Sequence, residues 1–290
     1  RMRSSNRDAL NVEAPSCADP QPRRVDATRM TWPGLGTSRI TWTFGVSAAI
    51  VGAFLVSLII RPTGSYFAPV DGWGVAVFEL TMGAVCLTRF LDLSRHSSRS
   101  AARVFPLVLG PACISWALGD VTLTIESLGG AKPPVPSVAD AFYLGFYPLC
   151  FAGFVMVIRR GNSGSLVATS LDGLIAGLAG ASISAAFLFS AVLKTTGGST
   201  LSAATAIAYP VADVLLLALA VGGLAILPKG YRRFLVLAGV AIAANATGDT
   251  FNLLQPNSRM GYICNAVAWP ISLLMLAIAT WVQPANVLVK

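Results

Sequence analysis

The chain has 290 residues, of which 54% are apolar and only 12% are charged, and its formal net charge is +8. Soluble globular proteins carry about 25% charged residues, so this composition excludes an ordinary soluble domain and indicates a polytopic membrane protein. The positive charge does not indicate nucleic-acid binding. The basic residues gather between long apolar runs, where they set the topology of a membrane protein.

Residues 1–38 are polar, contain several arginines and prolines and lack periodicity, so we predict a disordered cytoplasmic tail. Eight apolar segments follow, each near the roughly 20 residues that cross a bilayer as a helix. The predicted spans are 40–60, 74–91, 104–125, 138–158, 169–193, 203–227, 232–254 and 260–282. We therefore expect an all-α integral membrane protein, a bundle of about eight transmembrane helices in residues 39–284. Residues 285–290 would form a short cytoplasmic C-terminal end.

Lysine and arginine are distributed unevenly between the two sides of this topology. One side receives 17 of the 21 basic residues, including Arg89, Arg95, Arg99 and Arg103 in the predicted second loop. Cytoplasmic loops are enriched in lysine and arginine. We therefore expect a multi-pass protein of the plasma (cell inner) membrane with both termini in the cytoplasm.

A weak internal repeat divides the predicted bundle into two four-helix halves. The sequence Ala-Leu-Gly-Asp at 117–120 is matched by Ala-Thr-Gly-Asp at 246–249. The span after each carries an aromatic-proline pair, Tyr147-Pro148 in the first half and Trp269-Pro270 in the second. Parallel repeats of this kind occur in transporters, although chance similarity between apolar segments is an alternative explanation.

Acidic residues inside the spans are the candidate site residues, because charge within a bilayer is costly and is usually functional. Asp120, Asp213 and Asp249 lie inside spans, as does Glu79, and Asp140 lies at the start of one. The topology places them in the outer half of the membrane. Aromatic residues that share this layer are Tyr143, Tyr147, Tyr209 and Trp269. We expect this layer to bind a small-molecule or cation ligand that enters from the outer side.

Structural roles compete with this interpretation. Ser137-Val138-Ala139-Asp140 matches a capping box at a helix start. Glu79 would reach interfacial water, as would Glu126. The buried aspartates would form hydrogen bonds between helices, with Asn245 or Ser115 as partners. Tyrosine and tryptophan also form ordinary belts at membrane interfaces.

No sequence pattern supports catalysis, so we expect a protein that is not an enzyme, with no catalytic residues. The single histidine, His96, lies in a polar segment, which excludes a Ser-His-Asp triad within the membrane and a haem held by two histidines. The five cysteines form no C-x-x-C pair, and no metal-ligand spacing occurs. We expect no metal and no cofactor.

A series of short motifs between residues 100 and 282 suggests a family. They are Ala-Leu-Gly-Asp (117–120), Pro-Pro-Val-Pro-Ser-Val-Ala-Asp (133–140), Leu-Asp-Gly-Leu-Ile (171–175), Tyr-Pro-Val-Ala-Asp (209–213) and Gly-Asp (248–249). Their order and spacing resemble the N-terminal multi-helix membrane region of actinobacterial cyclic-di-GMP signalling proteins. In that family the region precedes cytoplasmic diguanylate cyclase (GGDEF) domains and often EAL domains. The sequence up to Lys290 contains no such domain, so we expect either a fragment of a longer protein, in which an enzymatic output domain follows, or a stand-alone relative without an output domain of its own.

Three functions are consistent with these patterns. The resemblance implies a non-enzymatic membrane sensor, or input module, that passes a signal to a cytoplasmic signalling domain or protein and acts as a homodimer. The acidic residues and the repeat also fit a cation- or proton-coupled small-molecule transporter. In the third alternative the protein is structural, and its acids only connect helices within the lipid bilayer.

Overall fold

The computed structural model describes residues 37–62, 65–96, 101–130, 133–161, 199–255 and 257–282. Within these residues the backbone is almost entirely helical and contains no strand. The described helices that are long and apolar enough to cross a membrane number seven. They are α1 (Thr37–Ile60), α2 (Val75–His96), α3 (Val104–Glu126), α4 (Val138–Gly161), α6 (Thr200–Ile226), α7 (Arg232–Leu254) and α8 (Arg259–Val282).

The predicted all-α membrane bundle is confirmed, and seven of the eight predicted spans coincide with these helices. Apolar runs locate the helices well because a helix satisfies all of its own backbone hydrogen bonds where lipid offers no partner. The predicted span at 169–193 lies outside the described residues. A π-helical turn, η1 (Pro69–Gly74), precedes α2 and lengthens the second span beyond the predicted start.

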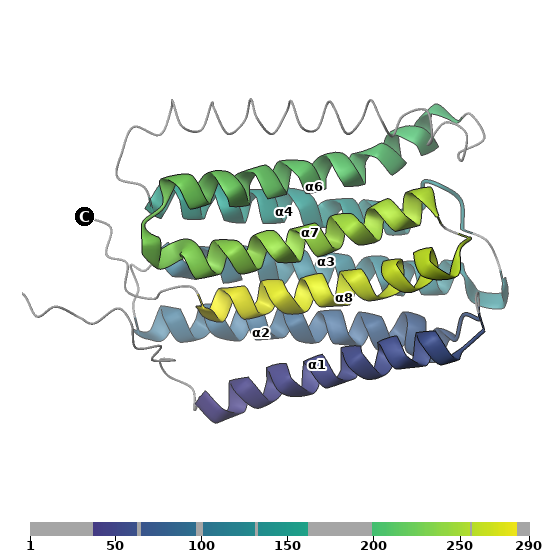
Figure 1. The fold of residues 1–290 in the computed structure, drawn as a ribbon, viewed down its shortest axis with the longest axis horizontal. Helices are drawn as coiled ribbons and strands as arrows, with labels where there is room; N and C mark the ends of the chain where they lie inside the picture. The colour runs from purple at the N-terminus through teal and green to yellow at the C-terminus, as the bar shows by residue number, and fades with distance from the viewer. Residues whose placement is uncertain are drawn as a thin grey trace, which may run out of the picture. The chain divides into compact units, whose positions relative to one another are not determined.

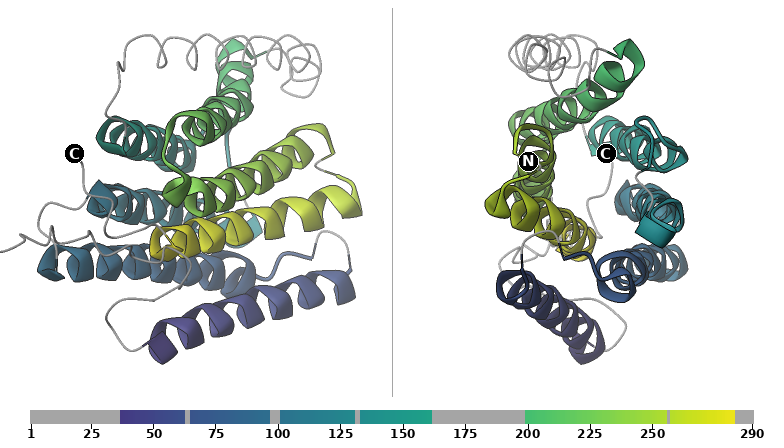
Figure 2. Two further views of the ribbon diagram at one scale, coloured as in Figure 1. Left: turned by 60° about the vertical axis from the view of Figure 1, so that its left-hand side comes forward. Right: turned by 90° about the vertical axis from the view of Figure 1, so that its right-hand side faces the viewer.

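The helices pack in two facing layers, as the two views of Figure 2 show. One layer consists of α2, α3 and α4, and the other of α6, α7 and α8. Contacts between α4 and α6 and between α2 and α8 join the layers at their two edges. Helix α1 packs against α8 and is the least buried of the long helices.

The two ends of the bundle differ in their charge. At one end, on the right of Figure 1, α1, α3 and α7 finish and α4, α6 and α8 begin; we call it the pocket end. The opposite, basic end carries Arg39, Arg95, Arg159, Arg160 and Lys229. Helices α4 and α6 run parallel, so α4 finishes and α6 begins at opposite ends (Figure 1). The span predicted at 169–193 would have to connect these two opposite ends.

The prediction that Arg89 lies in the second loop is wrong. Helix α2 continues to His96, so Arg89 lies within the helix with only 1% of its surface exposed. Its guanidinium donates to Asp92 at 3.0 Å and lies over the Trp281 ring, 5.0 Å from the centroid. The prediction failed because the charge of Arg89 suggested a loop, whereas an acidic partner and an aromatic ring accommodate it in the core.

Aromatic rings fill the interior of the bundle towards its basic end. The Phe105 ring lies 5.0 Å from that of Phe154 and 4.9 Å from that of Phe234, both in edge-to-face geometry. All three side chains are fully buried. Large apolar side chains such as Trp42 and Val77 remain exposed on the outer faces, where a bilayer would cover them.

An ion pair closes the connection between α1 and η1 at the pocket end. Arg61 donates from two nitrogens to Asp71, at 2.6 and 2.9 Å. Asp71 also accepts the Phe67 amide hydrogen at 2.7 Å. The hydrogen bonds to Asp71 raise the pKa of Arg61 above its usual value. The pair therefore ties the residue after α1 to the first turn of η1.

Candidate ligand-binding site

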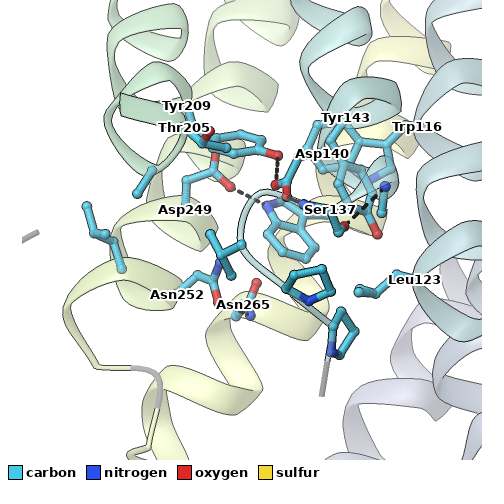
Figure 3. A pocket seen from close by; sticks show the side chains of 17 residues that line it. Trp116, Leu123, Ser137, Asp140, Tyr143, Thr205, Tyr209, Asp249, Asn252 and Asn265 are labelled. Atoms are coloured by element: carbon cyan, nitrogen blue, oxygen red, sulfur yellow. Dashed lines mark hydrogen bonds between the residues drawn. The ribbon is translucent and has the colours of Figure 1, made fainter. Parts of the chain in front are cut away.

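A cavity of about 480 Å³ opens at the pocket end, between the two layers (Figure 3). The ends of α3 and α7, the beginnings of α4, α6 and α8, and the segment 133–137 enclose it. Its polar and aromatic lining residues are Trp116, Ser137, Asp140, Tyr143, Thr205, Tyr209, Asp249, Asn252, Asn265 and Trp269. The apolar remainder comes mainly from Leu123, Leu253 and the prolines of the 133–137 segment.

Asp140 stands at the first turn of α4 and has two partners. One carboxylate oxygen accepts the Ser137 amide hydrogen at 2.7 Å, while the Ser137 hydroxyl accepts from the Ala139 amide at 3.2 Å. The predicted capping box is therefore confirmed, and it fixes where α4 begins. The other oxygen accepts from the Tyr209 hydroxyl of α6 at 2.7 Å (Figure 3). Asp140 thus both caps α4 and lines the cavity.

Asp249 of α7 reaches the cavity from the opposite layer. Its Oδ1 accepts from the Trp269 indole at 2.7 Å, and its Oδ2 accepts from the Tyr147 hydroxyl at 2.8 Å. The Asn245 amide, one turn earlier on α7, adds a longer contact to Oδ2 at 3.4 Å. Donors from α4, α7 and α8 therefore hold a carboxylate that is only 5% exposed.

Asp213 of α6 lies behind Asp249 and does not line the cavity. The Asn245 amide donates to its Oδ1 at 3.0 Å, whereas its buried Oδ2 has no hydrogen-bond partner within the described residues. The predicted interhelical role of Asn245 is confirmed. The same prediction for Ser115 is wrong, because its hydroxyl donates to the Phe142 carbonyl. That carbonyl belongs to the neighbouring helix α4.

Glu79 of α2 and Asp120 of α3 form a second acidic pair. Asp120 accepts from the Tyr143 hydroxyl at 2.5 Å. The Glu79 carboxyl lies next to the Asp120 carboxyl. Glu79 is 0% exposed, and neither of its oxygens has a hydrogen-bond donor in the described structure. The prediction that Glu79 reaches interfacial water is therefore wrong, because α2 turns this face towards α3. Glu126, by contrast, is partly exposed and accepts the Val138 amide at 3.3 Å.

Aromatic side chains form the wall between the two acidic groups. The Trp116 ring lies 5.1 Å from that of Tyr143 and 5.6 Å from that of Trp269, measured between centroids. Gly119 allows this arrangement, because a Cβ at that position would lie 2.5 Å from atoms of the Tyr143 ring. The Tyr147 ring extends the wall towards Tyr209. The centroids of these two rings are 6.1 Å apart.

The structure separates the predicted site residues into two sets. Those that line the cavity are Asp140, Asp249, Tyr143, Tyr209 and Trp269. Those that lie behind its wall are Glu79, Asp120, Asp213 and Tyr147. The second set reaches the first through the Tyr143 and Tyr147 hydroxyls and through Asn245.

Two asparagines in the cavity were not among the predicted site residues. The Asn265 side-chain amide donates to the side-chain oxygen Oδ1 of Asn252 at 3.0 Å, joining α8 to α7. Helical spacing could have found both, because Asn252 lies three residues after Asp249 and Asn265 lies four before Trp269. Trp116, which also was not among the predicted site residues, lies at the centre of the wall.

The charged side chains in the described lining of the cavity are all acidic. Two carboxyl groups line it, and no lysine or arginine does so among the described residues. No group of three histidine, cysteine, aspartate or glutamate side chains in the described part of the chain is arranged to hold a metal ion. The described lining of the cavity is therefore acidic, polar and aromatic.

Comparisons of the chain with family models, with curated proteins and with solved structures find no match.

Proposed function

We propose that the chain is the ligand-binding membrane region of a sensor, and that its cavity binds a small organic cation such as an amine. One observation carries this proposal. A cavity of about 480 Å³ combines two carboxyl groups with four aromatic side chains and no basic residue in its described lining. Cavities of this size suit small molecules, and aromatic faces attract cations through their quadrupoles.

The positions of the charges match an elongated cation with a polar end. Asp140 stands on the α4–α6 side of the cavity, and Asp249 stands on the α7–α8 side (Figure 3). Pro210 supplies no amide hydrogen to the Ala206 carbonyl, and Ala206 lines the cavity. That carbonyl, with Asn252 and Asn265, offers hydrogen-bond acceptors for the polar end.

Helix α8 is the proposed carrier of the signal. Trp269 touches the cavity in the first half of α8, and Pro270, directly after it, lacks the amide hydrogen for one backbone hydrogen bond within this continuous helix. At the far end of α8, Trp281 packs against Arg89 of α2. A ligand that moves Trp269 would therefore shift the helix end that leads towards the C-terminus. We propose that a cytoplasmic signalling domain of the cyclic-di-GMP type receives this movement, within a homodimer.

Cation- or proton-coupled transport is the second candidate, because Asn245 extends the polar network from Asp249 to Asp213 at greater depth. The small void next to Asp213 is lined mainly by apolar side chains and has no volume that a water molecule could enter. Sensing is therefore the better supported of the two. Proteoliposomes separate them, because a transporter would move the bound cation or protons across the bilayer.

The binding experiment uses choline as the cation and its uncharged carbon isostere as the comparison. The full chain in lipid nanodiscs would be titrated with each compound while tryptophan fluorescence is followed. Asp140→Asn and Asp249→Asn should each weaken choline binding at least tenfold. Glu126→Gln, which removes a carboxylate at the same end outside the cavity, should leave it unchanged. Equal binding of both compounds, or no effect of the two aspartate substitutions, would overturn the proposal.

We also propose how the bundle is oriented in the plasma membrane, with its basic end facing the cytoplasm. A membrane-impermeant thiol reagent applied to intact cells should label a cysteine placed at Ser127 in a cysteine-free variant. It should not label one placed at Arg160. The opposite pattern would place the cavity on the cytoplasmic side and contradict an external ligand.

A further inference from the structure

The Glu79–Asp120 pair forms a compact group of its own outside the cavity. Glu79 lies on α2, Asp120 on α3, and neither lines the cavity. Glu79 is 0% exposed, and both of its oxygens lack a hydrogen-bond donor among the described residues. Asp120 has one donor, the Tyr143 hydroxyl of α4 at 2.5 Å. A buried carboxyl without a donor needs an explanation, because buried polar groups are almost always hydrogen-bonded.

No positive charge among the described residues balances the pair. The titratable side chains that face it are Tyr143 from α4 and Cys113 from α3, with Cys86 of α2 beside Cys113. No lysine or arginine in the described structure acts on either carboxyl. Two adjacent carboxylates buried without a cation would suffer both mutual repulsion and loss of hydration. One bound proton removes both penalties.

We propose that Glu79 and Asp120 form a proton-binding site inside the membrane, in which the two carboxyl groups share one proton. The Tyr143 hydroxyl stabilises Asp120 as the ionised partner, so Glu79 carries the proton and donates it to Asp120. A protonated carboxyl is a donor as well as an acceptor. The shared proton therefore supplies the hydrogen bond that no other described residue provides to Glu79.

The Asp213–Asp249 pair has the same construction in the other layer of the bundle. Consecutive helices again contribute the two acids, and one acid takes most of the donors. Asp249 accepts from Tyr147, Trp269 and Asn245, while Asp213 keeps one buried oxygen without a partner. The two pairs differ in access, because Asp249 lines the cavity and both members of the Glu79–Asp120 pair lie behind it.

The proton-binding site is linked to the cavity through Tyr143. Its hydroxyl is bound to Asp120, and its ring lines the cavity and packs against Trp116 at 5.1 Å. Loss of the shared proton would place a second negative charge beside the Tyr143 hydroxyl and change which oxygen it bonds. The position of the cavity wall would then depend on pH.

Infrared spectroscopy of the full chain in lipid nanodiscs tests the proton directly, without any ligand. At neutral pH the wild type should absorb in the carbonyl-stretch region of protonated carboxylic acids. Glu79→Gln should remove one component of this band, because Glu79 carries the shared proton. Asp120→Asn should shift that component, because it changes the acceptor to which the protonated Glu79 donates. Asp71→Asn, which removes a carboxylate that is ion-paired with Arg61, should leave the band unchanged.

Asp213→Asn serves as the second control, because it should remove a different component that Glu79→Gln retains. The proposal is overturned if the Glu79→Gln and Asp120→Asn spectra superpose on the wild-type spectrum in this region. Since amide side chains resemble carboxylic acids in shape, both variants should fold, and the amide band confirms their helical content.

The link to the cavity rests on the proposed cation site and has its own measurement. Choline affinity should change with pH in the wild type, by up to tenfold per pH unit for one linked proton. Glu79→Gln should reduce this dependence. If the infrared component is lost as expected but choline does not bind, the proton-binding site stands and only the proposed ligand class fails.

Discussion

Tyr147 of α4 donates its hydroxyl hydrogen to Asp249 of α7 at 2.8 Å, across 102 positions of sequence. The same hydroxyl accepts from the Asn245 amide at 3.1 Å. This single oxygen therefore joins the two layers of the bundle at the depth where the cavity ends. Both residues are about 5% exposed, so water cannot replace the lost partner if one is removed.

Tyr147→Phe should accordingly destabilise the protein by about 1–3 kcal/mol, because it leaves buried groups on Asp249 and Asn245 with fewer partners. Chemical unfolding in detergent micelles, followed by circular dichroism, measures the change. Tyr66→Phe is the matched control: Tyr66 is exposed and its contact with Thr124 is long, at 3.4 Å. That substitution should stay within about 0.5 kcal/mol. Equal losses in both variants would contradict the assigned role of Tyr147.

Arg89→Met should cost about 3–5 kcal/mol, because it breaks a buried ion pair by removing one of its two partners. The double substitution Arg89→Met with Asp92→Leu should recover much of this loss, since apolar side chains can replace a buried ion pair. Arg95→Met, at an exposed position of the same helix, should change stability little. Thermal unfolding of the purified variants gives the comparison. A double variant as unstable as the single one would show that Arg89 acts through packing against Trp281 instead.

Gly119→Ala should destabilise the protein by about 1–3 kcal/mol through overpacking, since the new methyl group would overlap the Tyr143 ring. The displaced ring should also weaken the hydrogen bond to Asp120 and alter Trp116 fluorescence. Gly222→Ala is the matched control, because nothing lies within 4 Å of the added Cβ there. It should be neutral or stabilising by up to about 1 kcal/mol, from the higher helix propensity of alanine. If the two glycines behave alike, the close approach at Gly119 is not real.

Arg61→Gln should lower stability by about 1 kcal/mol or less, because the Arg61 side chain is 21% exposed in its pair with Asp71. The loss should shrink as salt concentration rises, since salt screens a partly exposed ion pair. Arg259→Gln is the control at the same end, because Arg259 donates to the uncharged Ile59 carbonyl. Its effect should not depend on salt. A loss at Arg61 that is independent of salt would mean that geometry, and not charge, holds this turn.

The predicted spans required only local information. The helix Val104–Glu126 matches the predicted span 104–125 almost residue for residue, and Ser137 and Asp140 cap α4 as their spacing indicates. The cost of placing a residue in lipid depends on that residue and its neighbours in sequence. Hydropathy and capping patterns therefore locate the helix ends without knowledge of the fold.

The rotation of each helix was not predictable in the same way. Glu79 was expected to reach water and instead faces Asp120, and Arg89 was expected in a loop and instead lies under Trp281. Helices such as α3 are apolar on nearly every side, so their sequence does not distinguish a lipid-facing surface from a protein-facing one. A buried charge finds its partner only when two such helices pack together.

By itself the sequence determined that this chain is an all-α membrane protein and which acids lie within its spans. Only the tertiary structure decided that Asp140 and Asp249 share a cavity with Tyr209 and Trp269, while Glu79 and Asp120 lie behind its wall. The physical reason is that the transfer of each segment into lipid is a local property of the chain. The grouping of the acids depends on contacts between segments up to 102 positions apart, such as Tyr147 and Asp249.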